Sequence, residues 1–151
     1  SQVLARDWGY QIEPIEPALD FDFLVGWTGQ PAISKEMIVQ VKSAIGPDFL
    51  EPTQVAVEAI ARGLKTGDKE LIKSSLLEVS RLLKDLHPAI YTKELLDLQA
   101  AVEGLDAIAK SSGSGGGDCG IALSFNPAHS QEIIERWRKA GIELLFRQGS
   151  L

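Results

Sequence analysis

The chain has 151 residues, of which 44% are hydrophobic and 24% charged, a composition typical of a globular domain with its own core. Its net charge of −6, with the basic residues scattered, argues against nucleic-acid and anionic-membrane partners, and no apolar run approaches the roughly 18 residues of a membrane-spanning helix. A single cysteine, Cys119, excludes an internal disulfide framework and favours a reducing compartment, which we expect to be the cytoplasm.

The N-terminal part of the chain predicts two strands. Residues 8–15, WGYQIEPI, alternate loosely, and Pro14 would end this strand or confine it to a sheet edge, because proline donates no hydrogen bond. Residues 20–27, DFDFLVGW, alternate and then become wholly apolar, which indicates a more buried strand. The chain starts without methionine and without the apolar core of a secretory signal, so we expect a processed chain or a fragment of a longer protein.

Four helices are predicted in the middle of the chain, where apolar residues recur at helical spacing. Ser34, Thr53 and Thr92 are expected N-caps, because their hydroxyls can accept a hydrogen bond from a first-turn N–H group. Glycine and proline residues are expected to end the first three helices. The expected ranges are 34–46, 53–67, 68–88 and 92–109.

The last part of the chain predicts a strand, a helix and a strand. CGIALSF (119–125) is typical of a buried strand, Asn126-Pro127 of the cap and first turn of a fifth helix, and IELLFR (142–147) of a final strand. The predicted fold class is therefore α+β, a four-stranded sheet with helices stacked on one face. Parallel and antiparallel pairing both remain open at this point.

A glycine-rich segment, KSSGSGGGDCG (110–120), lies between the fourth predicted helix and the strand at 119–125. Ordinary helix-to-strand loops have about 2–6 residues, so a plain connection explains it poorly. A disordered linker is disfavoured because strong elements flank the segment closely. The third interpretation is an anion cradle, in which consecutive N–H groups converge on a phosphate and glycine lets the backbone approach it. The segment is neither a Walker loop nor a dinucleotide fingerprint, since both of those open a helix.

KSSGSGGGDCGIAL resembles the third motif of the GHMP kinase superfamily, K-x-[ST]-G-A-G-x-G-G, and its GGGDCGIAL continuation is similar to the bacterial phosphomevalonate kinase family. RDWGYQIEPI…DFDFLVGWTGQPAISKEM resembles the segment through which those enzymes enter their C-terminal half. The resemblance extends from about Arg6 to Arg147. It implies that residues 1–151 form a GHMP kinase C-terminal domain, a ferredoxin-like sandwich with extra helices.

The resemblance implies an ATP-dependent phosphotransferase. Such enzymes transfer the γ-phosphoryl group of ATP, with Mg²⁺, to 5-phosphomevalonate and form 5-diphosphomevalonate on the mevalonate route to isoprenoids. The family's nucleotide loop and its catalytic lysine and aspartate precede the region matching Trp8, so we expect no catalytic residue and no metal ligand in this chain. The expected partners are ATP, 5-phosphomevalonate and an N-terminal ATP-binding domain, without which the chain should be inactive.

The resemblance also implies which residues contact the phosphates. They are the glycine-rich loop and the serine of PAIS: Ser34, Ser112, Gly113, Ser114, Gly115, Gly116, Gly117 and Asp118. Ser114 stands where the superfamily usually has alanine, and it is small enough to fit. We expect Asp118 to accept hydrogen bonds from the loop rather than to act as a base. Lys110, at the expected helix end, would suit the helix dipole or contact the phosphate directly.

Two other functions remain open from the sequence. The chain could be a non-catalytic module that binds a small metabolite, because ferredoxin-like domains often serve as sensors. It could instead belong to a GHMP kinase for a related substrate such as mevalonate, against which only the GGGDCG continuation argues. The tryptophans Trp8, Trp27 and Trp137 are expected in the core.

Overall fold

The computed structural model describes residues 17–29, 34–88, 90–111 and 119–149 of the chain. The strands within these ranges are β1 (Asp22–Trp27), β2 (Ala107–Ser111), β3 (Cys119–Ser124) and β4 (Glu143–Gly149). The helices are α2 (Lys35–Ala44), α3 (Pro47–Thr66), α4 (Lys69–Leu86), α5 (Lys93–Ala100) and α6 (Pro127–Lys139). The strand expected at 8–15 lies outside the described residues.

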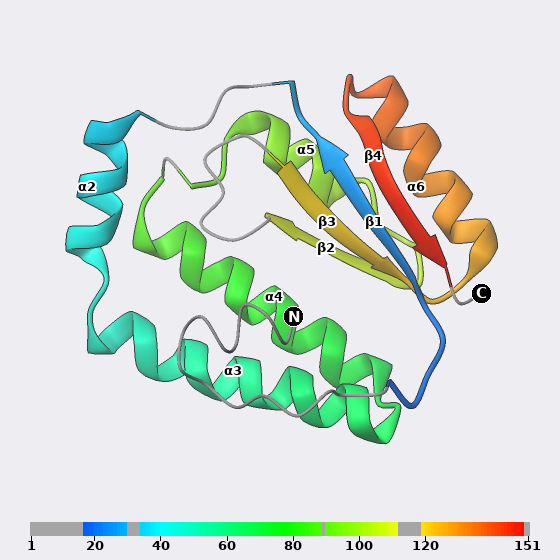
Figure 1. Ribbon diagram of the computed structural model, residues 1–151, viewed down its shortest axis with the longest axis horizontal. Helices are drawn as coiled ribbons and strands as arrows, with labels where there is room; N and C mark the ends of the chain where they lie inside the picture. The colour runs from blue at the N-terminus through cyan, green and yellow to red at the C-terminus, as the bar shows by residue number, and fades with distance from the viewer. Residues whose placement is uncertain (1–16, 30–33, 89, 112–118, 150–151) are drawn as a thin grey trace.

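The described strands form one four-stranded sheet in the order β2-β3-β1-β4, and every neighbouring pair is antiparallel (Figure 1). The predicted α+β class is confirmed, and the pairing that the sequence left open is antiparallel. Gly26 of β1 lies opposite Gly120 of β3, and Ser111 of β2 lies opposite the same Gly120 from the other side. This register decides which strand ends lie side by side.

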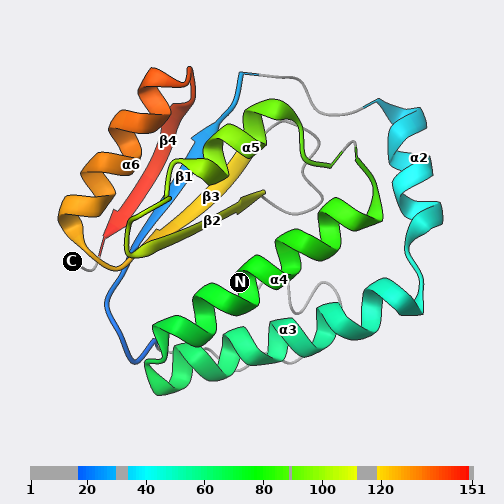
Figure 2. The same cartoon turned by 180° about the vertical axis from the view of Figure 1, so that it is seen from behind.

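Helices α5 and α6 cover one face of the sheet, as Figure 2 shows from behind. Buried side chains from β1, α5 and α6, including Leu24, Leu95 and Trp137, form the main core there. Helix α4 runs past the outer strand β2 and packs against it, and α3 lies along α4. A smaller cluster joins Ile72 of α4 to Ile108 of β2. Helices α5 and α6 are therefore the expected layer on one face, and α3 and α4 extend the fold beyond β2.

The expected helix at 92–109 is wrong in its second half. Helix α5 ends at Ala100, the chain turns at Gly104 with a left-handed φ of +77°, and the following residues form β2. The stretch has helical spacing, and alanine favours helices locally. Pairing with β3 overrides that preference, because the alanines of β2 are small enough to lie buried against α5.

The sequence signals at helix starts are confirmed for α2, α5 and α6. Ser34 and Thr92 accept hydrogen bonds from first-turn N–H groups at 3.3 Å, and Asn126 accepts one at 2.9 Å. Helix α3, however, begins at Pro47 rather than near Thr53. An extended glycine precedes Pro47, and proline at the first helical position is already set for the helix, so the earlier start is favourable.

Trp137 lies fully buried in the main core, as expected, and its indole N–H donates to the Leu98 carbonyl at 3.1 Å. Trp27 was also expected in the core but is 40% exposed. Successive side chains of a strand point to opposite faces, so Trp27 faces away from α5 and α6. Trp8 lies outside the described residues.

Two glycines that lie opposite each other, Gly26 and Gly120, let helices α5 and α6 approach the sheet closely. A Cβ added to Gly26 would lie 2.9 Å from the Trp137 ring, and one added to Gly120 would lie 2.6 Å from the Leu98 side chain. Glycine within a strand often marks such a close approach. A side chain at Gly26 would overlap the rigid Trp137 ring, and one at Gly120 would require the Leu98 side chain to move.

Gly26→Ala is expected to lower the free energy of unfolding by about 1–3 kcal/mol, because the new methyl group would overlap the Trp137 ring. Gly46→Ala is the matched control, since nothing lies within 4 Å of an added Cβ there. As a change of N-cap residue it should cost less than about 1 kcal/mol. Urea denaturation measures both changes, and equal losses would contradict the overlap at Gly26.

Candidate functional site

The register of the sheet brings several strand ends together. Strand β1 ends at Trp27, which lies opposite Cys119 at the start of β3 and Glu143 at the start of β4. Strand β2 ends at Ser111, beside the same end of β3. Both flanks of the glycine-rich segment therefore lie at this end of the sheet, and α2 stands on the same side of the molecule (Figure 1 and Figure 2).

Most of the predicted site residues lie outside the described residues. They are Ser112, Gly113, Ser114, Gly115, Gly116, Gly117 and Asp118. Their contacts with phosphate therefore remain predictions. The described flanks correct one expectation, because the segment joins two antiparallel strands rather than a helix and a strand. Its two ends are consequently held at the spacing of paired strands.

Ser34, the remaining predicted site residue, is the N-cap of α2. Its Oγ accepts a hydrogen bond from the Met37 N–H, so the expected cap is present. Ser34 and Lys35 are both exposed. The first turn of a helix leaves N–H groups without helical partners and carries the positive end of the helix dipole, which favours an anion. Contact between Ser34 and a phosphate remains a prediction.

Side chains hold both main-chain groups of Ser111, the residue that precedes the glycine-rich segment. The Ser111 N–H donates to the Tyr91 hydroxyl at 2.9 Å, and that hydroxyl donates to Ser80 Oγ of α4 at 3.0 Å. The Ser111 carbonyl accepts a hydrogen bond from Lys110 Nζ. Ser111, Ser80 and Tyr91 are all buried, so these bonds form away from water. Tyr91 could not be identified from the sequence, because its partner lies 20 residues along the chain and no local pattern links the two.

The sequence predicts Lys110 at the end of a helix. This prediction is wrong, because Lys110 lies in β2. Burial lowers the pKa of its ammonium group below the ordinary value of 10.5. No carboxylate among the described residues offsets this shift. An ammonium group beside a strand end, with no carboxylate partner among the described residues, would be a favourable neighbour for a phosphate, since the anion would stabilise its charge.

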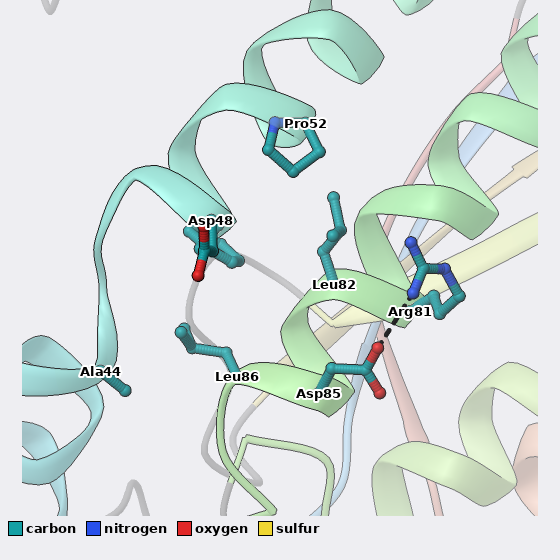
Figure 3. A pocket seen from close by; sticks show the side chains of 8 residues that line it. Ala44, Asp48, Pro52, Arg81, Leu82, Asp85 and Leu86 are labelled. Carbon is teal, nitrogen blue, oxygen red and sulfur yellow. Dashed lines mark hydrogen bonds and ion pairs between the residues drawn. The ribbon is translucent and has the colours of Figure 1, made fainter.

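A pocket of about 420 Å³ opens between the start of α3 and the end of α4 (Figure 3). Apolar side chains such as Leu82 contribute to its lining. Arg81 also lines it but pairs with Asp85 at 3.0 Å and with a second carboxylate of α4. Ser34 and Lys110 are not among the described residues around it. Because its described lining offers no unpaired cation, we place the candidate phosphate site at the end of the sheet instead.

The part of the chain that the structure describes holds no group of three or more histidine, cysteine, aspartate or glutamate residues that could bind a metal ion. The acidic residue Asp106, for example, forms ion pairs with lysines. It accepts from Lys69 at 2.7 Å and from Lys73 at 2.9 Å. Burial alone would raise the pKa of Asp106, but the two lysines lower it overall. None of the described helices is both long and apolar enough to cross a membrane.

Comparison with known proteins links this geometry to a kinase family. Residues 56–143 match the family model of the GHMP kinases C terminal. The chain is 31% identical to the phosphomevalonate kinase of Streptomyces sp. (strain CL190), over 93% of this chain and 41% of that protein. The crystal structure of Streptococcus pneumoniae phosphomevalonate kinase matches with 43% identity and a TM-score of 0.90, over 98% of this chain and 46% of that one. Its complex with phosphomevalonate and AMPPNP matches with 43% identity and a TM-score of 0.88, over 98% and 45%.

The chain therefore spans less than half the length of these relatives. The family expected from the glycine-rich motif is confirmed by a match that lies mostly in other parts of the chain, from α3 to the start of β4. The matched residues make up more than half of the 151, and the antiparallel sheet superimposes closely on solved members. The chain belongs to the GHMP kinase family and forms its C-terminal domain.

Proposed function

We propose that the protein containing this chain is an ATP-dependent phosphomevalonate kinase. It would transfer the γ-phosphoryl group of ATP to 5-phosphomevalonate and release ADP and 5-diphosphomevalonate. The observation that carries the proposal is the close likeness to the S. pneumoniae enzyme over almost the whole chain. Shared fold alone would not support a choice of substrate, but this level of sequence identity does. In this proposal the chain supplies the C-terminal domain, and an N-terminal domain outside it binds ATP.

The glycine-rich residues 112–118 are proposed to bind the phosphate of 5-phosphomevalonate and the group in transfer. Consecutive N–H groups with few Cβ atoms around them can converge on phosphate oxygens, and phosphoryl transfer depends chiefly on such positioning. The described flanks support this role, because Ser111 is held by Tyr91 and Cys119 begins a paired strand. Ser34 would present the first turn of α2 to the same ligand.

ATP and Mg²⁺ belong to the proposed reaction, in which the metal neutralises charge on the β- and γ-phosphates. The described residues do not fit a Mg²⁺ site, because they include no suitable cluster of acidic side chains. We therefore propose that ATP and the N-terminal domain supply the ligands of the metal. The single cysteine suits a reducing compartment, and we propose that the protein acts in the cytoplasm.

The intact protein is expected to release ADP from ATP when 5-phosphomevalonate is present, whereas the 151-residue chain alone should show no turnover. The reason is that the nucleotide loop and the catalytic groups are proposed to lie outside this chain. A coupled assay for ADP measures both, with mevalonate as the comparison substrate. Turnover by the isolated chain would contradict the placement of the catalytic groups, and a preference for mevalonate would contradict the substrate. Calorimetry tests the alternative that the chain is a non-catalytic sensor. A sensor would bind another metabolite tightly and would not bind 5-phosphomevalonate.

Ser34→Asp and Ser34→Asn form a matched pair that separates helix capping from ligand contact. Both residues cap helices about as well as serine, so each variant should change stability by less than about 0.5 kcal/mol. The carboxylate would repel a phosphate at the start of α2, so Ser34→Asp should raise the KM for 5-phosphomevalonate at least about tenfold above that of Ser34→Asn. Steady-state kinetics and thermal melting measure these effects. Equal KM values would place Ser34 away from the substrate.

Lys110→Met removes a charge that burial disfavours. The pKa of Lys110 is lowered in the folded state, so between that lowered value and 10.5 the unfolded state binds more protons and wild-type stability rises with pH. The stability of the wild type relative to the variant should therefore rise with pH, and this pH-dependent difference is the expected result. Denaturant titrations from neutral pH to about 10 measure it. A difference that does not depend on pH would mean that Lys110 is solvated.

A further inference from the structure

We propose that Tyr91 is a positioning residue for the glycine-rich segment. Its hydroxyl holds Ser111, the last residue of β2, from which that segment starts. The proposal rests on the proposed function, in which residues 112–118 bind phosphate. Tyr91 acts through Ser111 and contacts neither substrate nor nucleotide.

Among the described strands, β2 is an outer one whose far edge has no neighbouring strand. Main-chain groups on such an edge usually bond to water. Ala109 and Ser111 of β2 are nevertheless 1% and 0% exposed, so their outer groups need protein partners. Side chains supply them: Gln99 donates to the Ala109 carbonyl at 3.1 Å, and Tyr91 accepts from the Ser111 N–H at 2.9 Å.

The Tyr91 hydroxyl has one defined orientation, because it donates as well as accepts. It donates to Ser80 Oγ at 3.0 Å, and Ser80 is only 1% exposed. Lys84, one turn further along α4, lies over the Tyr91 ring, with its Nζ 4.9 Å from the ring centroid. Tyr91 therefore connects α4 to the last residue of β2.

Groups that donate hydrogen bonds to a phosphate in transfer must be placed accurately. Ser111 pairs with Gly120 of β3, which holds it from one side. Removal of the Tyr91 hydroxyl would take away a buried hydrogen bond to the Ser111 N–H, and the end of β2 would be held less firmly. A displacement of about 1 Å in a positioning element can cost on the order of 100-fold in rate. Loss of one hydroxyl at this point should therefore be visible in catalysis.

The test is Tyr91→Phe in the intact protein, which removes the hydroxyl and keeps the ring. We expect kcat/KM for 5-phosphomevalonate to fall at least about tenfold, while the KM for ATP stays within about twofold. Gln99→Met is the matched control, because it removes another side-chain bond to the β2 edge, two residues farther from the segment. It should change neither constant by more than about twofold.

Hydrogen exchange of the peptide that contains Ser111 gives a readout that does not depend on catalysis. Exchange there should be faster in Tyr91→Phe than in the wild type, and unchanged in Gln99→Met, since Gln99 protects a carbonyl and not an N–H. A wild type that does not phosphorylate 5-phosphomevalonate would overturn the proposed function, and with it the catalytic part of this inference. Faster exchange in Tyr91→Phe would still support the anchoring of Ser111.

Wild-type kinetics in a folded Tyr91→Phe variant would overturn the positioning role. An equal loss in Gln99→Met would overturn it too, because the effect would then come from general weakening of β2. If Tyr91→Phe does not fold, Ser80→Ala provides the second test, since it removes only the acceptor of the tyrosine proton. We expect a smaller fall in kcat/KM for 5-phosphomevalonate with the KM for ATP unchanged. Unaltered kinetics in that variant would also overturn the proposal.

Discussion

The close approach of α5 and α6 to the sheet, over the facing glycines Gly26 and Gly120, is the constraint on which the rest of the structure depends. With no Cβ at these positions, Leu98 and Trp137 lie against the main chain of the two central strands. A one-residue slip between those strands would bring a side chain beneath the covering helices, so the contact selects one register. That register brings the end of β2 and the start of β3 to one end of the sheet. The location of the two flanks of the glycine-rich segment is therefore a consequence of core packing.

Elements defined by nearby residues could be predicted from the sequence, and elements defined by distant partners could not. The start of α6 follows from Asn126 and Pro127, which lie next to it, and β3 follows from its own apolar run. The stretch 107–111 has the local preference of a helix and becomes a strand only because it pairs with β3. The exposure of Trp27 has the same origin, because the face of β1 that is covered depends on helices that come later in the chain.

The candidate site divides in the same way. The capping role of Ser34 could be predicted, since its donor Met37 is three residues away. The glycine content alone indicated a possible anion cradle. The expectation for Lys110 was wrong because it was assigned to a helix that does not extend so far. Tyr91 could not be found at all, since its partner belongs to a strand that the sequence pattern concealed.

A strand pair is a better support for a glycine-rich segment that is proposed to bind phosphate than the end of a helix would be. Glycine loses more backbone entropy on ordering than any other residue, and holding the ends of a loop together costs further entropy. Pairing of β2 with β3 already holds Ser111 and Gly120 at strand spacing, about 5 Å. The entropy cost of bringing the two ends of the loop together is therefore incurred when the sheet folds, before any ligand binds. Helix ends fray, whereas Ser111 is buried and bonded on its outer side as well. The proposed phosphate contacts would therefore lie between two flanks that the sheet already holds, and phosphoryl transfer depends chiefly on such positioning.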